Sequence, residues 1–172
     1  MNKHVDFSNE DIVIVRRRQF EEFINQSNAN TDNAKYRFCM HDSPENKLQE
    51  MFIVRKKGDY CMPDRHNDIP ETHIIMQGEE AVIMFGEDGK ILDVFFLGGE
   101  SDVLAYRINT AVYHMTVAIS EMAIDYEVKP GPFTPKTNEY PEWAPAYGED
   151  NKIEDFMKYI INEIEKRKCD KK

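Results

Sequence analysis

Short runs of β-branched and aromatic residues alternate with polar stretches from about residue 35 to residue 130. Eight such runs occur, separated by Gly, Asn, Asp and Pro, as in a chain of β-strands and turns. The stretch 87–90 (EDGK) predicts a hairpin turn, because Gly89 can adopt the positive φ that the turn needs. No helical pattern intervenes, so the chain predicts an all-β sandwich or small barrel. The runs are residues 34–40, 49–57, 72–77, 81–85, 90–97, 102–108, 112–119 and 122–128.

An N-terminal arm, residues 1–34, precedes these strands. Residues 16–26 (RRRQFEEFINQ) carry apolar side chains on one side and predict a short amphipathic helix. Residues 11–15 (DIVIV) predict a short strand or an extended arm, and residues 27–33 predict a polar loop. The apolar side of the helix consists of Phe20, Phe23 and Ile24.

The character of the chain changes after the barrel segment, residues 35–130. Residues 131–149 contain four prolines in their first 15 positions, so they predict a segment that wraps the outside, with Phe133 and Trp143 as apolar anchors. Residues 150–172 predict an amphipathic helix. Such a helix typically packs on its own domain, and a dimer contact is the alternative. Its apolar stripe is Ile153, Phe156, Met157, Ile160, Ile161 and Ile164.

Length and charge narrow the function classes. A chain of 172 residues suits one domain with its own core. The net charge of −10 disfavours a nucleic-acid partner, since a phosphate backbone is repelled on average. No apolar run is long enough to cross a bilayer and the start lacks the build of a signal peptide, so a cytoplasmic location is expected. Cys39, Cys61 and Cys169 form no CxxC pair and suggest neither a disulfide framework nor a thiolate zinc site.

One motif carries most of the candidate chemistry. It reads Gly-x5-Asp64-x-His66-x4-Glu71-x6-Gly, and His114 follows 43 positions after Glu71. Asp64 and His66 lie two apart, so on a strand both point to the same side, and His114 can join them only if the sheet curls into a barrel. The spacing resembles that of a cupin metal site, with aspartate where the first histidine is usual. Two imidazoles with carboxylates suit a divalent transition metal such as Fe, Mn, Ni or Zn.

Further residues are candidates for substrate chemistry. His73 lies two residues beyond Glu71 and could serve as a catalytic acid or base; a hydrogen-bonded core histidine is the alternative. Tyr113 is a second catalytic candidate. Residues that could edge the pocket are Tyr60, Arg65, Tyr106 and Tyr126, but strand periodicity alone does not decide which of them face inward.

Four segments together resemble the WbuC family of cupin-fold metalloproteins: residues 37–44, 63–66, 108–114 and 127–145. The resemblance implies a jelly-roll barrel holding one metal and a tie to bacterial surface polysaccharide (O-antigen) gene clusters. It also places Arg37 and His41 at the family's early Arg and His, which suggests substrate binding; a structural role is the alternative. The family has Pro-His-Arg-His where this chain has residues 63–66, so Asp64 replaces the first ligand histidine.

Two main hypotheses follow. In the first, the protein is a metalloenzyme, an isomerase, epimerase or oxygenase, acting on a small polar molecule such as a sugar or nucleotide sugar. In the second, it is a non-catalytic cupin that binds a sugar or another small molecule and has a weakened or lost metal site. An assembly protein built around the terminal helix is a third possibility. By analogy with other cupins, we expect a homodimer.

Overall fold

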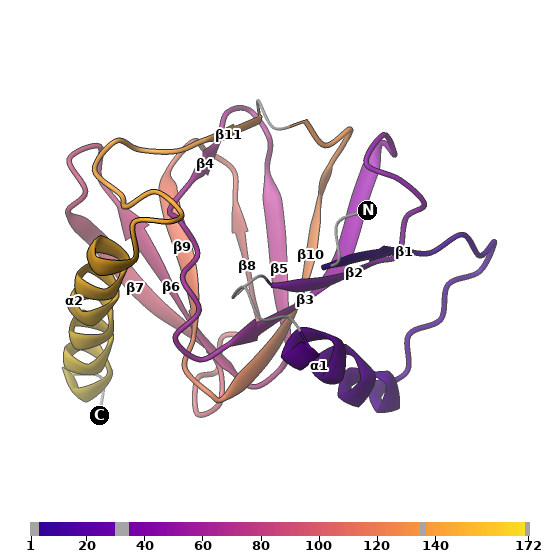
Figure 1. The fold of residues 1–172 in the computed structure, drawn as a ribbon, viewed down its shortest axis with the longest axis horizontal. Helices are drawn as coiled ribbons and strands as arrows, with labels where there is room; N and C mark the ends of the chain where they lie inside the picture. The colour runs from indigo at the N-terminus through magenta and orange to yellow at the C-terminus, as the bar shows by residue number, and fades with distance from the viewer. Residues whose placement is uncertain (1–3, 30–34, 135–136, 171–172) are drawn as a thin grey trace.

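The computed structural model describes residues 4–29, 35–134 and 137–170. Within these ranges the chain forms a six-stranded sheet of order β1-β2-β3-β10-β5-β8, a three-stranded sheet of order β7-β6-β9, and a two-stranded ribbon of β11 and β4 (Figure 1). The strands are β1 Val5–Phe7, β2 Tyr36–Cys39, β3 Leu48–Lys56, β4 Arg65–His66, β5 Glu71–Gln77, β6 Glu79–Phe85, β7 Ile91–Gly98, β8 Ala105–Ile108, β9 Tyr113–Ala118, β10 Met122–Pro130 and β11 Asn138–Glu139. The helices are α1 Phe20–Ala29 and α2 Asp150–Asp170, and a 3-10 turn spans Arg17–Gln19.

All eight predicted strands are present. The hairpin between β6 and β7 turns at residues 86–90, where Gly89 has a φ of 79°. Three short strands, β1, β4 and β11, were not predicted because two or three residues carry too little pattern. The last of these corrects the prediction for residues 131–149: Asn138 and Glu139 do enter a small sheet, between the prolines.

The register of the strands sets what faces the interior. In the centre of the large sheet, β10 pairs antiparallel with both β3 and β5. An isolated bridge joins Asp64 to His114, with their backbone N–H groups donating to each other's carbonyl oxygens at 3.1 and 2.9 Å. This bridge brings the motif segment against β9, so the barrel closure that the motif requires is present.

α1 packs on the large sheet. Phe20 and Phe23 are buried, and the ring of Phe23 stacks on Phe38 with a centroid distance of 5.0 Å. The helix begins four residues later than predicted, after the 3-10 turn, and continues to Ala29, with Ser27 fully buried. The predicted loop at 27–33 is therefore wrong for its first three residues, and residues 30–33 lie outside the described ranges. Residues 11–15 form no strand and run as an extended arm.

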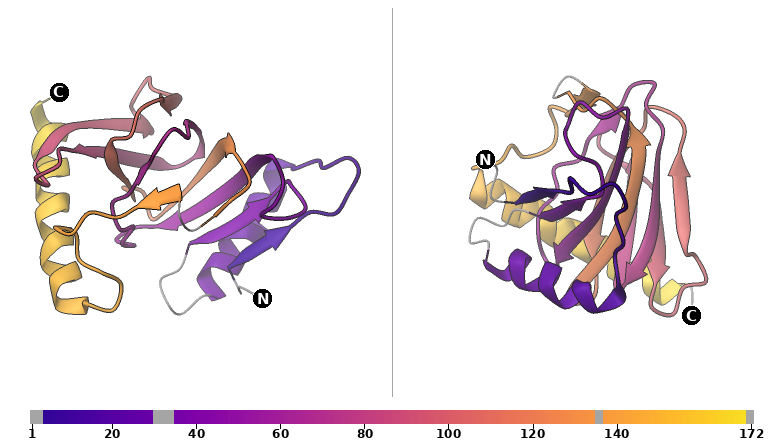
Figure 2. Two further views of the ribbon diagram at one scale, coloured as in Figure 1. Left: turned by 90° about the horizontal axis from the view of Figure 1, so that it is seen from above. Right: turned by 90° about the vertical axis from the view of Figure 1, so that its right-hand side faces the viewer.

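α2 packs on the small sheet at the opposite end of the molecule from α1 (Figure 2). Three members of its apolar stripe, Met157, Ile160 and Ile164, are buried in one cluster with side chains of β6, β7 and β9. Ile161 is 38 % exposed. The stripe therefore serves mainly the packing of its own domain.

The two expected anchors of residues 131–149 differ in outcome. The Trp143 ring packs on Phe85 with a centroid distance of 5.1 Å, as predicted. Phe133 is 45 % exposed, so its prediction as an anchor is wrong. No helix in the described part of the chain has both the length and the apolar character needed to cross a bilayer.

Candidate metal centre

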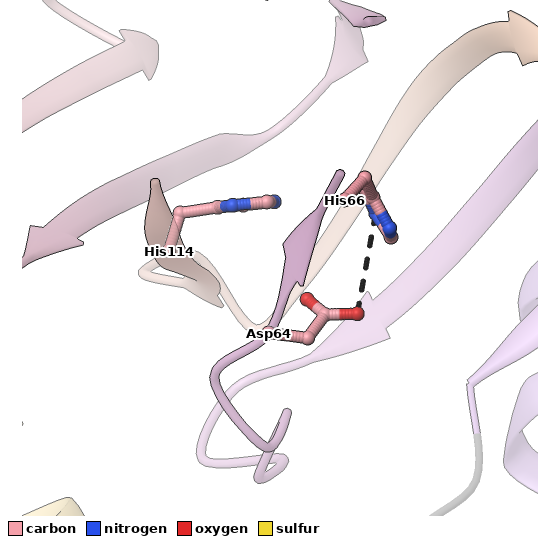
Figure 3. A group of neighbouring side chains, drawn as sticks. All are labelled: Asp64, His66 and His114. Atoms are coloured by element: carbon pink, nitrogen blue, oxygen red, sulfur yellow. Dashed lines mark ion pairs between the residues drawn. The ribbon is translucent and has the colours of Figure 1, made fainter. Parts of the chain in front are cut away.

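Three side chains of the motif converge inside the barrel (Figure 3). The donor atoms of Asp64, His66 and His114 all lie within 4.8 Å of one another. Asp64 directly precedes β4, His66 ends it, and His114 comes from β9. Asp64 and His66 share a face because they are two residues apart, and the backbone bridge to His114 fixes the third member opposite them.

Glu71, the first residue of β5, lies between the two imidazoles. Its Oε2 is 3.0 Å from His66 Nε2 and its Oε1 is 2.6 Å from His114 Nε2. Asp64 Oδ2 is 4.0 Å from His66 Nε2 and accepts a hydrogen bond from Asn138 Nδ2 at 2.7 Å. The structure thus brings all four residues of the expected ligand set together.

Glu71 controls the protonation of both histidines. Burial alone lowers the pKa of His66 and His114, but hydrogen bonding to the Glu71 carboxylate outweighs it, so both pKa values are raised. Burial likewise raises the pKa of Glu71, and its hydrogen bonds to the histidines more than reverse this, holding that pKa far below its ordinary value. His66 and His114 therefore bind protons more tightly than free histidines do, because each protonated ring faces the Glu71 carboxylate.

The donor chemistry fits a divalent cation. His114 Nδ1 lies 3.0 Å from the carbonyl oxygen of Val112, so a proton on Nδ1 is held by the backbone and Nε2 is free to ligate. A cation among two imidazole nitrogens and two carboxylates would take the place of the protons that Glu71 now shares with them. Nitrogen and oxygen donors together suit Fe, Mn, Ni or Zn.

The four residues line a cavity of about 120 Å³. His73 also lines it, buried, with Nε2 3.7 Å from Glu71 Oε2. Its Nδ1 lies 2.7 Å from Asp125 Oδ2, and its ring stacks on Tyr106 at a centroid distance of 4.9 Å. Burial lowers the pKa of His73, but the hydrogen bond to Asp125 outweighs it and raises this pKa to about 10. His73 is therefore protonated at neutral pH, beside the cavity.

A buried ion-pair network continues behind His73. Arg55 Nη1 is 2.8 Å from Asp125 Oδ1, and Arg55 Nε is 3.8 Å from Glu80 Oε1. Burial is the main reason that the pKa of Glu80 rises to about 8. Sequence reasoning missed this network, although a partial signal existed: Asp125 follows the apolar residues 122–124, and Arg55 follows the apolar residues 51–54.

Tyr113 and Arg65 face away from the cavity. The Arg65 guanidinium lies 4.4 Å from the centroid of the Tyr113 ring, and both side chains bind Glu139. Each is next in sequence to a residue of the centre, so strand alternation turns it to the opposite face. This placement does not support the expected catalytic role of Tyr113 or the expected substrate contact of Arg65.

The remaining candidates divide as follows. Arg37 lines the cavity. His41 instead bonds through Nδ1 to the backbone of Glu50, and the Tyr126 hydroxyl donates to Glu50 Oε1 at 2.8 Å. The Tyr60 hydroxyl donates to the carbonyl oxygen of Pro145 at 2.8 Å. Their geometry fits structural roles, and among the expected substrate contacts only Arg37 is placed to meet a ligand in the cavity.

Comparisons with known proteins bear on the fold. A family model described as a domain of unknown function (DUF6016) matches residues 15–97. No curated protein sequence matches the chain. The crystal structure of protein SO0799 from Shewanella oneidensis is similar with a TM-score of 0.51 and 8 % identity, over 63 % of this chain and 74 % of that one. The crystal structure of CapF with the inhibitor 3-isopropenyl-tropolone has the same TM-score and 14 % identity, over 66 % of this chain.

This chain matches 33 % of the length of CapF, about a third. At such identities the likeness shows the fold and nothing finer, so the resemblance to the WbuC family stays a prediction. The structural likeness to CapF, together with the two sheets and the flanking helices, confirms the predicted fold. That fold is an all-β cupin jelly roll with a short N-terminal helix and a C-terminal α-helix.

Proposed function

We propose that this cupin binds a divalent transition metal through Asp64, His66, Glu71 and His114 and acts as a metalloenzyme on a small polar molecule. The observation that carries the proposal is the position of Glu71, whose Oε2 and Oε1 lie 3.0 and 2.6 Å from the Nε2 atoms of His66 and His114 in the cavity. The donor atoms of Asp64, His66 and His114 lie within 4.8 Å of one another, and Glu71 joins them from β5 through its contacts with both histidines.

The chain's own residues would divide the work. A bound metal supplies Lewis acidity toward a carbonyl or hydroxyl oxygen of the substrate. His73, protonated and 3.7 Å from Glu71, is placed to donate a proton from Nε2 into the cavity. Asp125 holds the opposite ring nitrogen of His73 and so fixes the direction in which that proton points.

Elemental analysis tests the metal. The protein would be stripped with a chelator, reloaded separately with Fe(II), Mn(II), Ni(II) or Zn(II), desalted and analysed. We expect about one equivalent of at least one metal in the natural protein, as for a single four-donor site. His66→Gln should lose it, and His41→Gln, which changes a buried histidine outside the cavity, should keep it. Absence of stoichiometric metal after all four loadings would refute the proposal.

The second candidate, a binding protein with a weakened metal site, rests on Asp64. One oxygen of its carboxylate already accepts a hydrogen bond from Asn138, and it lies 4.0 Å from His66 Nε2. This candidate predicts thermal stabilisation by a ligand that survives chelator treatment and the His66→Gln substitution. If Asp64→His gains a metal that the natural protein lacks, this candidate replaces the first.

The resemblance of four segments to the WbuC family supports a finer proposal, a sugar or nucleotide-sugar substrate in bacterial surface polysaccharide (O-antigen) synthesis. A homodimer is proposed separately, by analogy with other cupins. Light scattering on the purified chain, and turnover of sugar substrates by the metal-loaded protein, would test these two statements separately.

A further inference from the structure

The cavity at the metal centre adjoins a larger hollow of about 720 Å³ beside α2. Lys35, Arg37 and Tyr147 line both spaces. The inner cavity, at about 120 Å³, is smaller than the cavity of about 150 Å³ that accommodates benzene in a protein interior. Only one end of a sugar-sized ligand fits inside it, and the remainder would lie in the hollow. The boundary between the two spaces is therefore where the middle of a ligand would rest.

Most charges of the inner cavity are already balanced within the protein. Arg55 pairs with Asp125 at 2.8 Å, and Lys129 pairs with Glu127 at 2.6 Å. Arg37 differs: among the described residues, no carboxylate lies in ion-pair distance of its guanidinium.

Lys35 lies two residues before Arg37 and forms no ion pair with a described carboxylate, although it interacts electrostatically with Asp59. Its Nζ donates to the Cys61 thiol, and no described carboxylate pairs with it. If the Asp64 and Glu71 carboxylates serve a divalent cation, two positive charges remain at the boundary. This local excess is unusual in a chain whose net charge is −10.

We propose that the ligand of this site carries an oxyanion, a carboxylate or phosphate, which Arg37 binds with help from Lys35. A guanidinium presents paired N–H donors that match two oxygens of either group. The rest of the proposal builds on the metal site: with the anion held at the boundary, the reacting end points inward toward Glu71 and His73. Anion recognition itself needs only the two cations.

Titration calorimetry of the natural protein with three probes tests the proposal. The probes are D-glucuronate, D-glucose 1-phosphate and D-glucose, which share a sugar ring and differ in charged group. At least one anionic probe should bind more tightly than glucose, and the identity of that probe separates carboxylate from phosphate. Arg37→Gln should weaken its binding by roughly 10- to 100-fold, the range for losing a charged hydrogen-bonding partner.

Arg107→Gln is the matched control, because Arg107 is exposed on β8 and does not line either space. Equal binding of all three probes, or equal losses in the two variants, would overturn the inference. Each titration would be repeated on metal-loaded and chelator-treated protein. Anion selectivity without stoichiometric metal refutes the proposed metal function alone, whereas metal binding without anion selectivity refutes the inference alone.

Discussion

Removing Arg55 should reveal how strongly the interior depends on balanced charge. Its side chain is 5 % exposed and faces Asp125 at 2.8 Å and Glu80 at 3.8 Å, both with at most 1 % exposure. Arg55→Met keeps most of the volume of the side chain and removes its charge. Asp125 would keep its hydrogen bond to His73, and Glu80 would face no cation within ion-pair distance among the described residues.

The expected loss of unfolding free energy depends on how deeply the ion pair is buried rather than on the distance between its two charged atoms. Breaking a buried ion pair by removing one partner costs about 3–5 kcal/mol, because the remaining charge stays away from water. Lys57, two residues further, pairs with Glu121 at 3.1 Å, but these side chains are 59 % and 86 % exposed. For such a pair we expect less than about 1 kcal/mol. Lys57→Met is therefore the matched control, with a similar distance and the opposite environment.

Urea unfolding followed by circular dichroism would give the free energy of unfolding at pH 8 and pH 5.5. Loss of Arg55, which lowers the pKa of Glu80, should raise that pKa further in the folded state, so the folded variant gains a proton as the pH falls. The free energy of unfolding of Arg55→Met should thus fall below that of the natural protein by the largest amount at pH 8 and by a smaller amount at pH 5.5. Adding Asp125→Asn to Arg55→Met should recover part of the loss. A loss no larger than that of Lys57→Met, or one independent of pH, would refute the reasoning.

Three further predictions concern stability, each measured by urea unfolding. Ile160→Ala should cost about 2–5 kcal/mol because Ile160 is 0 % exposed, whereas Ile161→Ala, at a 38 % exposed site, should cost less than about 1 kcal/mol. Gly78→Ala should destabilise more than Gly58→Ala: both have a φ of 83°, but only the Cβ at Gly78 would meet a backbone oxygen, at 2.4 Å. The pKa of Glu80, about 8 against an ordinary 4.5, means that stability falls as pH rises through that window, and Glu80→Gln should flatten this dependence between pH 5 and 8. Equal costs within either pair, or an unchanged pH profile, would contradict these arguments.

The convergence of the candidate ligands could be predicted because part of its information is periodic along a strand. Asp64 and His66 share a face by strand alternation, and the barrel brings Glu71 and His114 to them. The same alternation excludes Tyr113, which directly precedes His114, and it was available from the sequence. The prediction that Tyr113 is catalytic did not apply this alternation.

The ion-pair network could not be predicted in the same way. Arg55 and Asp125 are 70 residues apart, and their contact depends on the register between β3 and β10. A shift of that register by one residue would turn either side chain to the other face of the sheet, and the apolar runs around them do not specify it. The end of α1 was missed for a related reason, since Ser27 is polar in sequence but buried by tertiary packing.

The distribution of apolar surface explains how a small barrel can hold so many charges. On β9, His114 and Thr116 face the cavity, while Tyr113 and Val117 join the cluster packed against α2. On the large sheet, the aromatic residues around Phe52 pack with α1 in the same manner. The two larger apolar clusters therefore lie between a sheet and its helix, and burial there provides much of the stabilisation, while a smaller cluster of Cys39, Met51 and Ile53 packs with Val5 and Phe7 of β1. Because most of the apolar burial lies outside the space between the sheets, that space can hold charged side chains. Burying paired charges there costs desolvation energy, and this cost is offset functionally where the charges orient a ligand.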